Sequence, residues 1–178
     1  VDRASGYRTR CMLTLPLDVT SQDSIDAAVA ASVKERGGID VLVNNAGRGW
    51  SGSIEGIDES SVRAMFELNF FAVLSVTRAV LPGMRARANG WIVNVSSVAG
   101  LVSAPGFGHY SATKFAIEAI TDALRDEVAP HGISVLTVEP GAFRTNAYAG
   151  FANEPVAEAI PGYHDMLEQV RAAFVEMD

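Results

Sequence analysis

The feature that most constrains the fold is a repeated alternation between short apolar runs and helical patterns. Apolar runs rich in β-branched residues occupy residues 39–43, 91–95 and 133–138, and longer amphipathic segments separate them. Strands that are joined by helices pair in parallel through right-handed crossovers, and helices then cover both faces of their sheet. The sequence therefore predicts a doubly wound, parallel α/β sheet.

The remaining elements follow from capping signals and breakers. Residues 11–19 form another apolar run and predict a buried strand, which Pro16 restricts to a strand end or a sheet edge. Ser, Thr and Asp residues before periodic segments, and Gly or Pro residues after them, delimit the helices. Helices are expected at residues 20–37, 58–83 and 106–128, and from about residue 161 onward.

Length and composition indicate one globular domain over residues 1–178. The chain has 48% hydrophobic and 20% charged residues, which is ordinary for such a domain. A net charge of −7 argues against nucleic acid or an anionic membrane as partner. Cys11 is the single cysteine, so an internal disulfide is excluded, and no metal site is expected. Because the sequence has no apolar segment long enough to span a bilayer, we expect a soluble, cytoplasmic protein.

The strongest chemical signal is a phenol and an ammonium on the helix predicted at residues 106–128. Tyr110 and Lys114 are four residues apart, so their side chains lie on one helix face. A cation close to the phenol favours the phenolate, and Tyr110 becomes a candidate general acid and base. On the pair alone, an ordinary amphipathic helix with a solvated Lys is the favoured explanation. Ser97, however, precedes Tyr110 by 13 residues and directly follows an apolar strand.

Taken together, the order and spacing of these motifs resemble those of a known family. The chain resembles the classical short-chain dehydrogenase/reductase family between about residues 15 and 145. That family has a Rossmann-like sheet and uses NAD or NADP. The residues that carry the resemblance are Asn44-Asn45-Ala46-Gly47, Asn69, Ser97, Tyr110 and Lys114.

The resemblance implies a catalytic role for four of these residues in interconverting a secondary alcohol and a ketone. Tyr110 would exchange the hydroxyl proton, and Ser97 would hydrogen-bond the same substrate oxygen. Lys114 would lower the pKa of Tyr110 and hold the nicotinamide ribose. Asn69 would hold a water that relays protons to Lys114. From the residues alone, Asn69 interrupts an apolar helical stripe, and a structural amide bonded to backbone is the alternative.

Cofactor contacts are likewise implied by the resemblance, with NAD and NADP both left open. Asp18 would bind the adenine amino group, although a turn or capping Asp is the alternative from the sequence. The Asn-Asn-Ala-Gly segment would approach the cofactor with its backbone, or would be a plain turn. The expected cofactor-binding residues are Asp18, Val19, Asn45, Ala46, Gly47, Tyr110, Lys114, Pro140, Gly141 and Thr145.

Apolar residues around the predicted site favour a hydrophobic substrate. With Ser97, the expected pocket residues are Val98, Phe107 and Phe143, and residues 146–178 would cover the substrate. His109 is expected to be a surface residue. Surplus apolar residues on the helices at 58–83 and 106–128 indicate a second buried face, and the resemblance implies a homodimer or homotetramer.

One expected motif is missing, since no Gly-x-x-x-Gly-x-Gly follows a first strand. The resemblance thus implies a sequence cut at both ends, and residues 1–178 alone are expected to be weakly stable and to bind neither NAD nor NADP appreciably. The competing interpretation is a catalytically inert, truncated domain that acts by binding or dimerisation.

Overall fold

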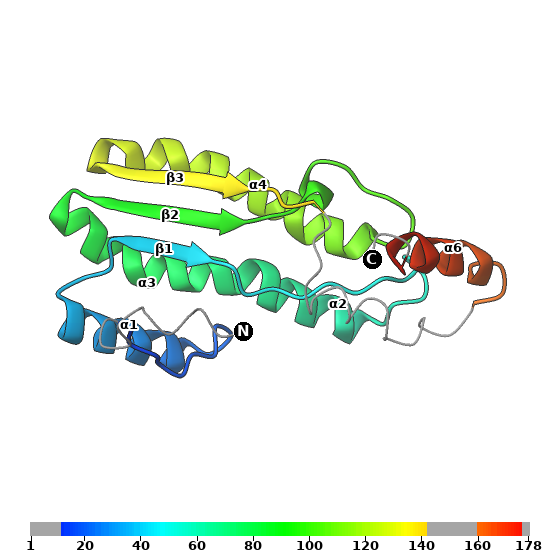
Figure 1. The fold of residues 1–178 in the computed structure, drawn as a ribbon, viewed down its shortest axis with the longest axis horizontal. Coiled ribbons are helices and arrows are strands. Elements are labelled where there is room, and N and C mark those ends of the chain that lie inside the picture. Colours follow the sequence, from blue (N-terminus) through cyan, green and yellow to red (C-terminus); the bar gives the residue numbers. More distant parts are fainter. Residues whose placement is uncertain (1–11, 142–159, 176–178) are drawn as a thin grey trace, which may run out of the picture.

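Three parallel strands form the centre of the molecule. The computed structural model describes residues 12–141 and 160–175. Figure 1 shows strands β1 (Val41–Asn44), β2 (Gly90–Val95) and β3 (Ile133–Val138) in the order β1-β2-β3. Ile92 of β2 stands between Leu42 of β1 and Val135 of β3. These strands confirm the predicted runs at residues 39–43, 91–95 and 133–138 to within two residues.

Helices connect the strands and begin and end largely where the capping residues predict. At the start of α1, the Ser21 side chain accepts a hydrogen bond from the backbone amide of Ser24. The same helix ends at Gly37, whose φ of 81° suits a glycine. The helices are α1 (Gln22–Arg36), α2 (Glu59–Phe66), α3 (Ala72–Arg87), α4 (Gly108–Val128) and α6 (His164–Val175), with a π-helical turn η2 (Glu67–Phe71) and 3-10 turns η3 (Val98–Gly100) and η4 (Ala129–His131).

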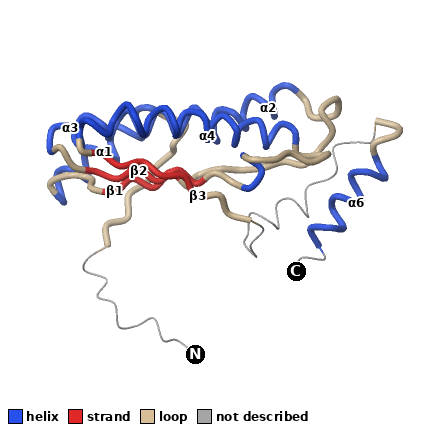
Figure 2. The backbone as a smooth tube through the Cα atoms, turned by 90° about the horizontal axis from the view of Figure 1, so that it is seen from above, coloured by secondary structure: helices blue, strands red, loops and turns tan. Residues whose placement is uncertain are grey.

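The main helices lie on one face of the sheet. Figure 2 shows α3 and α4 side by side over the strands. Along β2, Ile92 points into this layer and is fully buried, whereas Trp91 is 49% exposed on the opposite face. The core consists of Val80, Met84, Ile92, Val128, Ile133 and Val135. The parallel, Rossmann-like α/β sheet is therefore confirmed. In the described residues, the main helices cover one face of this sheet.

Helix α3 continues further than predicted. The expected end near Pro82 is wrong, because the helix runs through that residue to Arg87. Continuation buries Met84 completely in the core and lets Arg87 Nη2 donate to the Ile39 carbonyl oxygen at 2.6 Å. Burial of a large apolar side chain is worth about 2 kcal/mol, which helps to offset the backbone hydrogen bond that Pro82 cannot make.

The strand predicted at residues 11–19 is wrong over its described part, since residues 12–18 form no strand. Met12 is 77% exposed there, and Cys11 lies outside the described residues. An isolated run gains nothing from an extended backbone unless its amides find a partner strand, and Pro16 has no amide hydrogen. The segment instead ends in a turn in which Asp18 Oδ1 accepts from the Thr20 amide at 2.9 Å.

The continuous helical segment Glu59–Arg87 is long and apolar enough to cross a membrane by length and composition alone. In this fold its apolar residues pack in the protein core. Val76, Val80 and Met84 are buried on the side of the helix that packs against the sheet. The packing of a core helix thus accounts for this composition.

Candidate active site

The predicted catalytic serine follows the carboxyl end of β2. That strand ends at Val95, and Ser97 has the extended backbone of an N-cap, with a φ of −170° and a ψ of 159°. Its Oγ accepts a hydrogen bond from the Ala99 amide at 3.1 Å, which starts the 3-10 turn η3. Because ligands of open α/β sheets bind beyond the carboxyl ends of the strands, Ser97 occupies the expected edge.

Tyr110 lies in the first turn of α4 and is hydrogen-bonded to Ser97. Burial raises the pKa of Tyr110 above its usual value of 10.0, and the hydrogen bond with Ser97 opposes that rise. The lowering of the Tyr110 pKa by Lys114 that the resemblance implies stays a prediction. Desolvation of the phenolate outweighs the favourable contacts. Tyr110 is therefore a protonated phenol at neutral pH.

Lys114 is buried one helical turn after Tyr110, with only 7% of its surface exposed. Its Nζ donates to the Val95 carbonyl oxygen at 2.9 Å and lies 5.8 Å from the centre of the Tyr110 ring. Burial lowers the pKa of Lys114 from 10.5 to about 8, while the charge of Glu118 acts in the opposite direction. Lys114 is therefore still mostly charged at neutral pH.

Asn69 reaches the same region from the π-helical turn η2. It is 1% exposed, and its Oδ1 accepts from the Arg48 amide at 2.8 Å while its Nδ2 donates to the Arg48 carbonyl at 2.7 Å. A second Nδ2 hydrogen bond, of 3.1 Å, goes to Thr113 Oγ1 on α4. The backbone-bonded amide that the sequence left as an alternative is thus present. A π-turn is often found at functional sites.

Gly47 lies between Asn69 and Lys114. A Cβ atom on Gly47 would be 3.2 Å from Asn69 Oδ1 and 3.8 Å from Lys114 Nζ. The preceding residues Asn45 and Ala46 are exposed at the carboxyl end of β1. Small, exposed residues at this point leave the backbone open to a ligand. The four predicted catalytic residues therefore share one edge of the sheet with the Asn-Asn-Ala-Gly segment. Ser97 follows β2, Tyr110 and Lys114 lie on α4, and Asn69 lies in η2.

The other expected cofactor residues lie around this edge. Val19 lines a cavity of about 160 Å³ together with Asn45 and Ala46. Asp18 is exposed, and its hydrogen bonds with Thr20 lower its pKa. Asp18 thus has the geometry of a turn residue, which is the alternative that the sequence left open for it.

On the far side of Ser97, the Pro140 carbonyl accepts from the Val98 amide at 3.2 Å, and Gly141 has open space around it. Pro140 is thereby tied to the segment that carries Ser97. Thr145, which the resemblance places at the cofactor, lies outside the described residues.

The expected substrate residues differ in their accessibility. Val98 is 45% exposed beside Ser97, whereas Phe107 is 8% exposed and therefore offers little surface to a ligand. Phe143 and most of residues 146–178 lie outside the described residues. Within α6, Leu167 is close to Gly106, just before α4. The helix thus packs near the start of α4.

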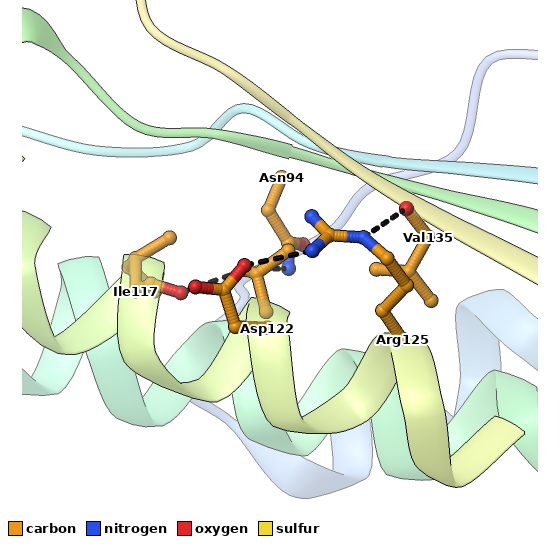
Figure 3. Close-up of polar contacts among 6 residues, drawn as sticks. Asn94, Ile117, Asp122, Arg125 and Val135 are labelled. Atoms are coloured by element: carbon orange, nitrogen blue, oxygen red, sulfur yellow. Dashed lines mark hydrogen bonds and ion pairs between the residues drawn. The ribbon is translucent and has the colours of Figure 1, made fainter.

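A buried polar network beneath the site escaped the sequence analysis. Asn94 accepts from Asn44 Nδ2 and donates to Thr121 Oγ1, both at 2.8 Å, and the same Asn44 atom donates to Thr77 Oγ1 at 3.1 Å. Figure 3 shows Asn94 directed from the sheet toward α4, where Arg125 also bonds the Val135 carbonyl. An amide at an inward position of an apolar strand was the signal that could have revealed the network.

Comparisons with known proteins agree with this geometry. The family model described as short chain dehydrogenase matches residues 4–155. The 3-ketodihydrosphingosine reductase of Bacteroides thetaiotaomicron is 44% identical over 131 residues, which cover 74% of this chain and 49% of that protein. A Streptomyces avermitilis short-chain dehydrogenase structure has a TM-score of 0.78 and 45% identity over 88% of this chain and 57% of its own.

Two further structures contain a nicotinamide cofactor. A metagenomic short-chain oxidoreductase in complex with NADP has a TM-score of 0.67 and 31% identity over 71% of this chain and 57% of its own. An NAD⁺-bound xylitol dehydrogenase has a TM-score of 0.71 and 29% identity over 75% of this chain and 53% of its own. The chain thus spans about half the length of the proteins that it matches.

Proposed function

Because the chain belongs to the short-chain dehydrogenase family, we propose that the whole protein is an NAD(P)-dependent oxidoreductase that interconverts a secondary alcohol and a ketone. One observation carries this proposal. Tyr110 is hydrogen-bonded to Ser97 and lies beside the buried ammonium of Lys114 at the carboxyl edge of the sheet. A proton donor, a second hydrogen-bonding group and a positive charge are what reduction of a carbonyl group requires.

Proton transfer at the substrate oxygen is assigned to Tyr110. Its raised pKa keeps the phenol protonated, so Tyr110 is ready to give its proton to a carbonyl oxygen. Ser97 orients that oxygen through a second hydrogen bond. The ammonium of Lys114, 5.8 Å from the Tyr110 ring centre, offsets the negative charge that develops as the proton leaves. The nicotinamide, when bound, supplies or accepts the hydride.

The residues present fit part of such a cofactor. The small residues Ala46 and Gly47 leave exposed backbone beside Lys114, and a Cβ at Gly47 would crowd Lys114 Nζ and Asn69 Oδ1. Asn45 to Gly47 would hold the nicotinamide end, and Lys114 would donate to its ribose hydroxyls. Val19 and Pro140 border the same edge. NAD and NADP fit these residues equally well.

Asn69 is assigned to the proton pathway through the backbone that it holds. Both of its amide hydrogens and its oxygen are bonded to protein groups, two of these bonds being with the backbone of Arg48. A carbonyl oxygen has a second lone pair, so the Arg48 carbonyl can accept from a water molecule while it is bonded to Asn69. We assign the relay of protons toward Lys114 to this water position.

The proposed substrate is a hydrophobic alcohol or ketone. Val98 and Leu101 expose apolar surface next to Ser97, at 45% and 56% of their areas. The relative named 3-ketodihydrosphingosine reductase acts, by its name, on a ketone with a sphingoid chain, and this supports the apolar choice. A panel of hydrophobic ketones and polyols with both cofactors tests the assignment, and a preference for polyols would refute it.

Assembly into a homodimer or homotetramer is also proposed. Phe71 on η2 and Phe115 on α4 are 48% and 45% exposed, and a second copy of the chain would cover them. Sedimentation of the natural protein tests this, with a strict monomer as the contrary result. We also propose a cytoplasmic enzyme without a nucleic-acid or membrane partner, and the net charge of −7 supports the absence of those two partners.

The decisive test of the activity is Tyr110→Phe in the natural, full-length protein. This change keeps the ring and removes only the proton donor, so turnover should fall by roughly 10²–10⁴-fold, as general acid and base groups contribute. A loss of less than about tenfold for Tyr110→Phe would contradict the role.

A further inference from the structure

A buried hydroxyl lies one residue before Lys114. Thr113 is fully buried on α4. Its Oγ1 donates to the Tyr110 carbonyl oxygen at 2.7 Å and accepts from Asn69 Nδ2 at 3.1 Å. The hydroxyl therefore uses its single hydrogen within its own helix and offers a lone pair to another element. It joins the helix that carries Tyr110 and Lys114 to the π-helical turn η2.

The hydrogen bonds of Asn69 allow only one orientation of its amide. The Arg48 amide donates to Oδ1 and the Arg48 carbonyl accepts from Nδ2, so a rotated amide would place like groups against each other. These two bonds leave one N–H of Asn69, and Thr113 accepts it. Without the Thr113 hydroxyl that buried donor has no partner among the described residues, and a buried donor of this kind is costly. Thr113 is thus the third point that fixes the amide.

The orientation of Asn69 matters because its oxygen faces the space beside Lys114. A Cβ on Gly47 would approach both Asn69 Oδ1 and Lys114 Nζ. The titratable neighbours of Lys114 in the described residues are Tyr110 and Glu118 on its own helix. From β2, the Val95 carbonyl accepts from Lys114 Nζ, and the Asn69 oxygen lies near the same Gly47 as that ammonium. The Asn69 oxygen and the Lys114 ammonium thus both lie next to Gly47.

We propose that Thr113 is a positioning residue, whose hydroxyl holds the Asn69 amide and the Arg48 backbone in the orientation that the site beside Lys114 requires. The proposal rests on the proposed oxidoreductase function for its catalytic consequence. Its structural half, the effect of Thr113 on the surroundings of Lys114, is measurable without any substrate.

The same helix offers a matched control two turns later. Thr121 is also fully buried, donates to the Ile117 carbonyl at 2.7 Å and accepts from Asn94 Nδ2 at 2.8 Å. Thr121→Val thus removes the same pair of bonds as Thr113→Val and leaves a buried Asn donor unpaired in the same way. Both variants should lose a similar amount of thermal stability, and only Thr113→Val should change the site.

The first measurement follows the lysine side chains by NMR through a pH titration. Lys34, the other lysine of the sequence, is exposed and serves as the internal reference, and Lys114→Arg assigns the Lys114 signal. In Thr113→Val one of the three hydrogen bonds that position the Asn69 amide beside Gly47 is lost. The pKa of Lys114 should then move away from about 8, because the polar groups around the ammonium are rearranged. Thr113→Ser, which keeps the hydroxyl, and Thr121→Val should match the unsubstituted protein.

The second measurement is turnover in the natural protein. In Thr113→Val, kcat should fall at least about tenfold, within the roughly 100-fold that an ångström-scale misplacement of reacting groups costs. KM should change much less, because the lost interaction orients groups and does not bind substrate. Thr113→Ser should restore kcat, and Thr121→Val should leave it unchanged.

Two results would overturn the proposal: an unaltered Lys114 titration in Thr113→Val, or equal effects of Thr113→Val and Thr121→Val on Lys114. If Thr113→Val does not fold, Thr113→Ala removes the same hydroxyl with less crowding and is read in the same way. Absence of oxidoreductase activity in the unsubstituted protein would count against the proposed function instead, and the titration would still decide the role of Thr113.

Discussion

Replacement of Lys114 by Met should reveal the energetic cost of keeping a charge inside the site. The pKa of Lys114 falls from 10.5 to about 8 on folding because the side chain is buried. Below about pH 8 the side chain is charged in both states, and the folded state bears the desolvation cost. Between pH 8 and 10.5 the folded protein loses this proton while the unfolded chain keeps it. Stability should therefore rise with pH across that window.

The magnitude follows from the size of the shift. A difference between 10.5 and about 8 corresponds to on the order of 3 kcal/mol at about 1.4 kcal/mol per unit. Lys114→Met removes this cost at neutral pH but leaves the Val95 carbonyl without its donor, which costs about 1–3 kcal/mol. At pH 7 the variant should thus be as stable as the parent protein or up to about 2 kcal/mol more stable.

Urea unfolding at intervals from pH 7 to 10.5 measures this effect. The stability of the variant relative to the parent should decline by on the order of 3 kcal/mol over that range, because the parent alone gains the proton-linked stability. Lys34→Met is the control, since Lys34 is exposed on α1. The reasoning would be refuted by a difference that stays constant with pH, or by a variant more than about 2 kcal/mol less stable at pH 7.

Two further predictions concern the scaffold beneath the site. Gly132 and Gly37 both have positive φ, but a Cβ on Gly132 would overlap the Ala88 carbonyl while Gly37 faces open space. Thermal unfolding should show Gly132→Ala losing clearly more stability than Gly37→Ala, whose strain costs about 1–2 kcal/mol, and equal losses would contradict the overlap. Asn94→Ala should lower stability by about 1–3 kcal/mol, because Asn44 Nδ2 loses one of its two acceptors. Asn89→Ala, at an exposed position, is its control in denaturant unfolding, and similar midpoints for the two variants would refute the network's importance.

The sequence by itself determined the order and type of most elements and the spacing of the candidate site. The three strands are contiguous apolar runs, α1 has clear capping residues at both ends, and α4 has a periodic apolar face, so short-range patterns suffice to place them. Four-residue spacing on α4 puts Tyr110 and Lys114 on one face whatever surrounds the helix. Ser97 follows the end of a parallel strand, where ligand-binding residues of such sheets gather.

The tertiary structure alone decided what depends on contacts between distant segments. Residues 12–18 match a strand in their composition, but a strand exists only where a neighbour accepts its hydrogen bonds. Helix α3 passes Pro82 because Met84 finds a buried place against the sheet. The pKa of Tyr110 is raised because burial by other elements outweighs the hydrogen bond with Ser97. Thr113 meets Asn69 across 44 positions of sequence, and no local pattern records such a contact.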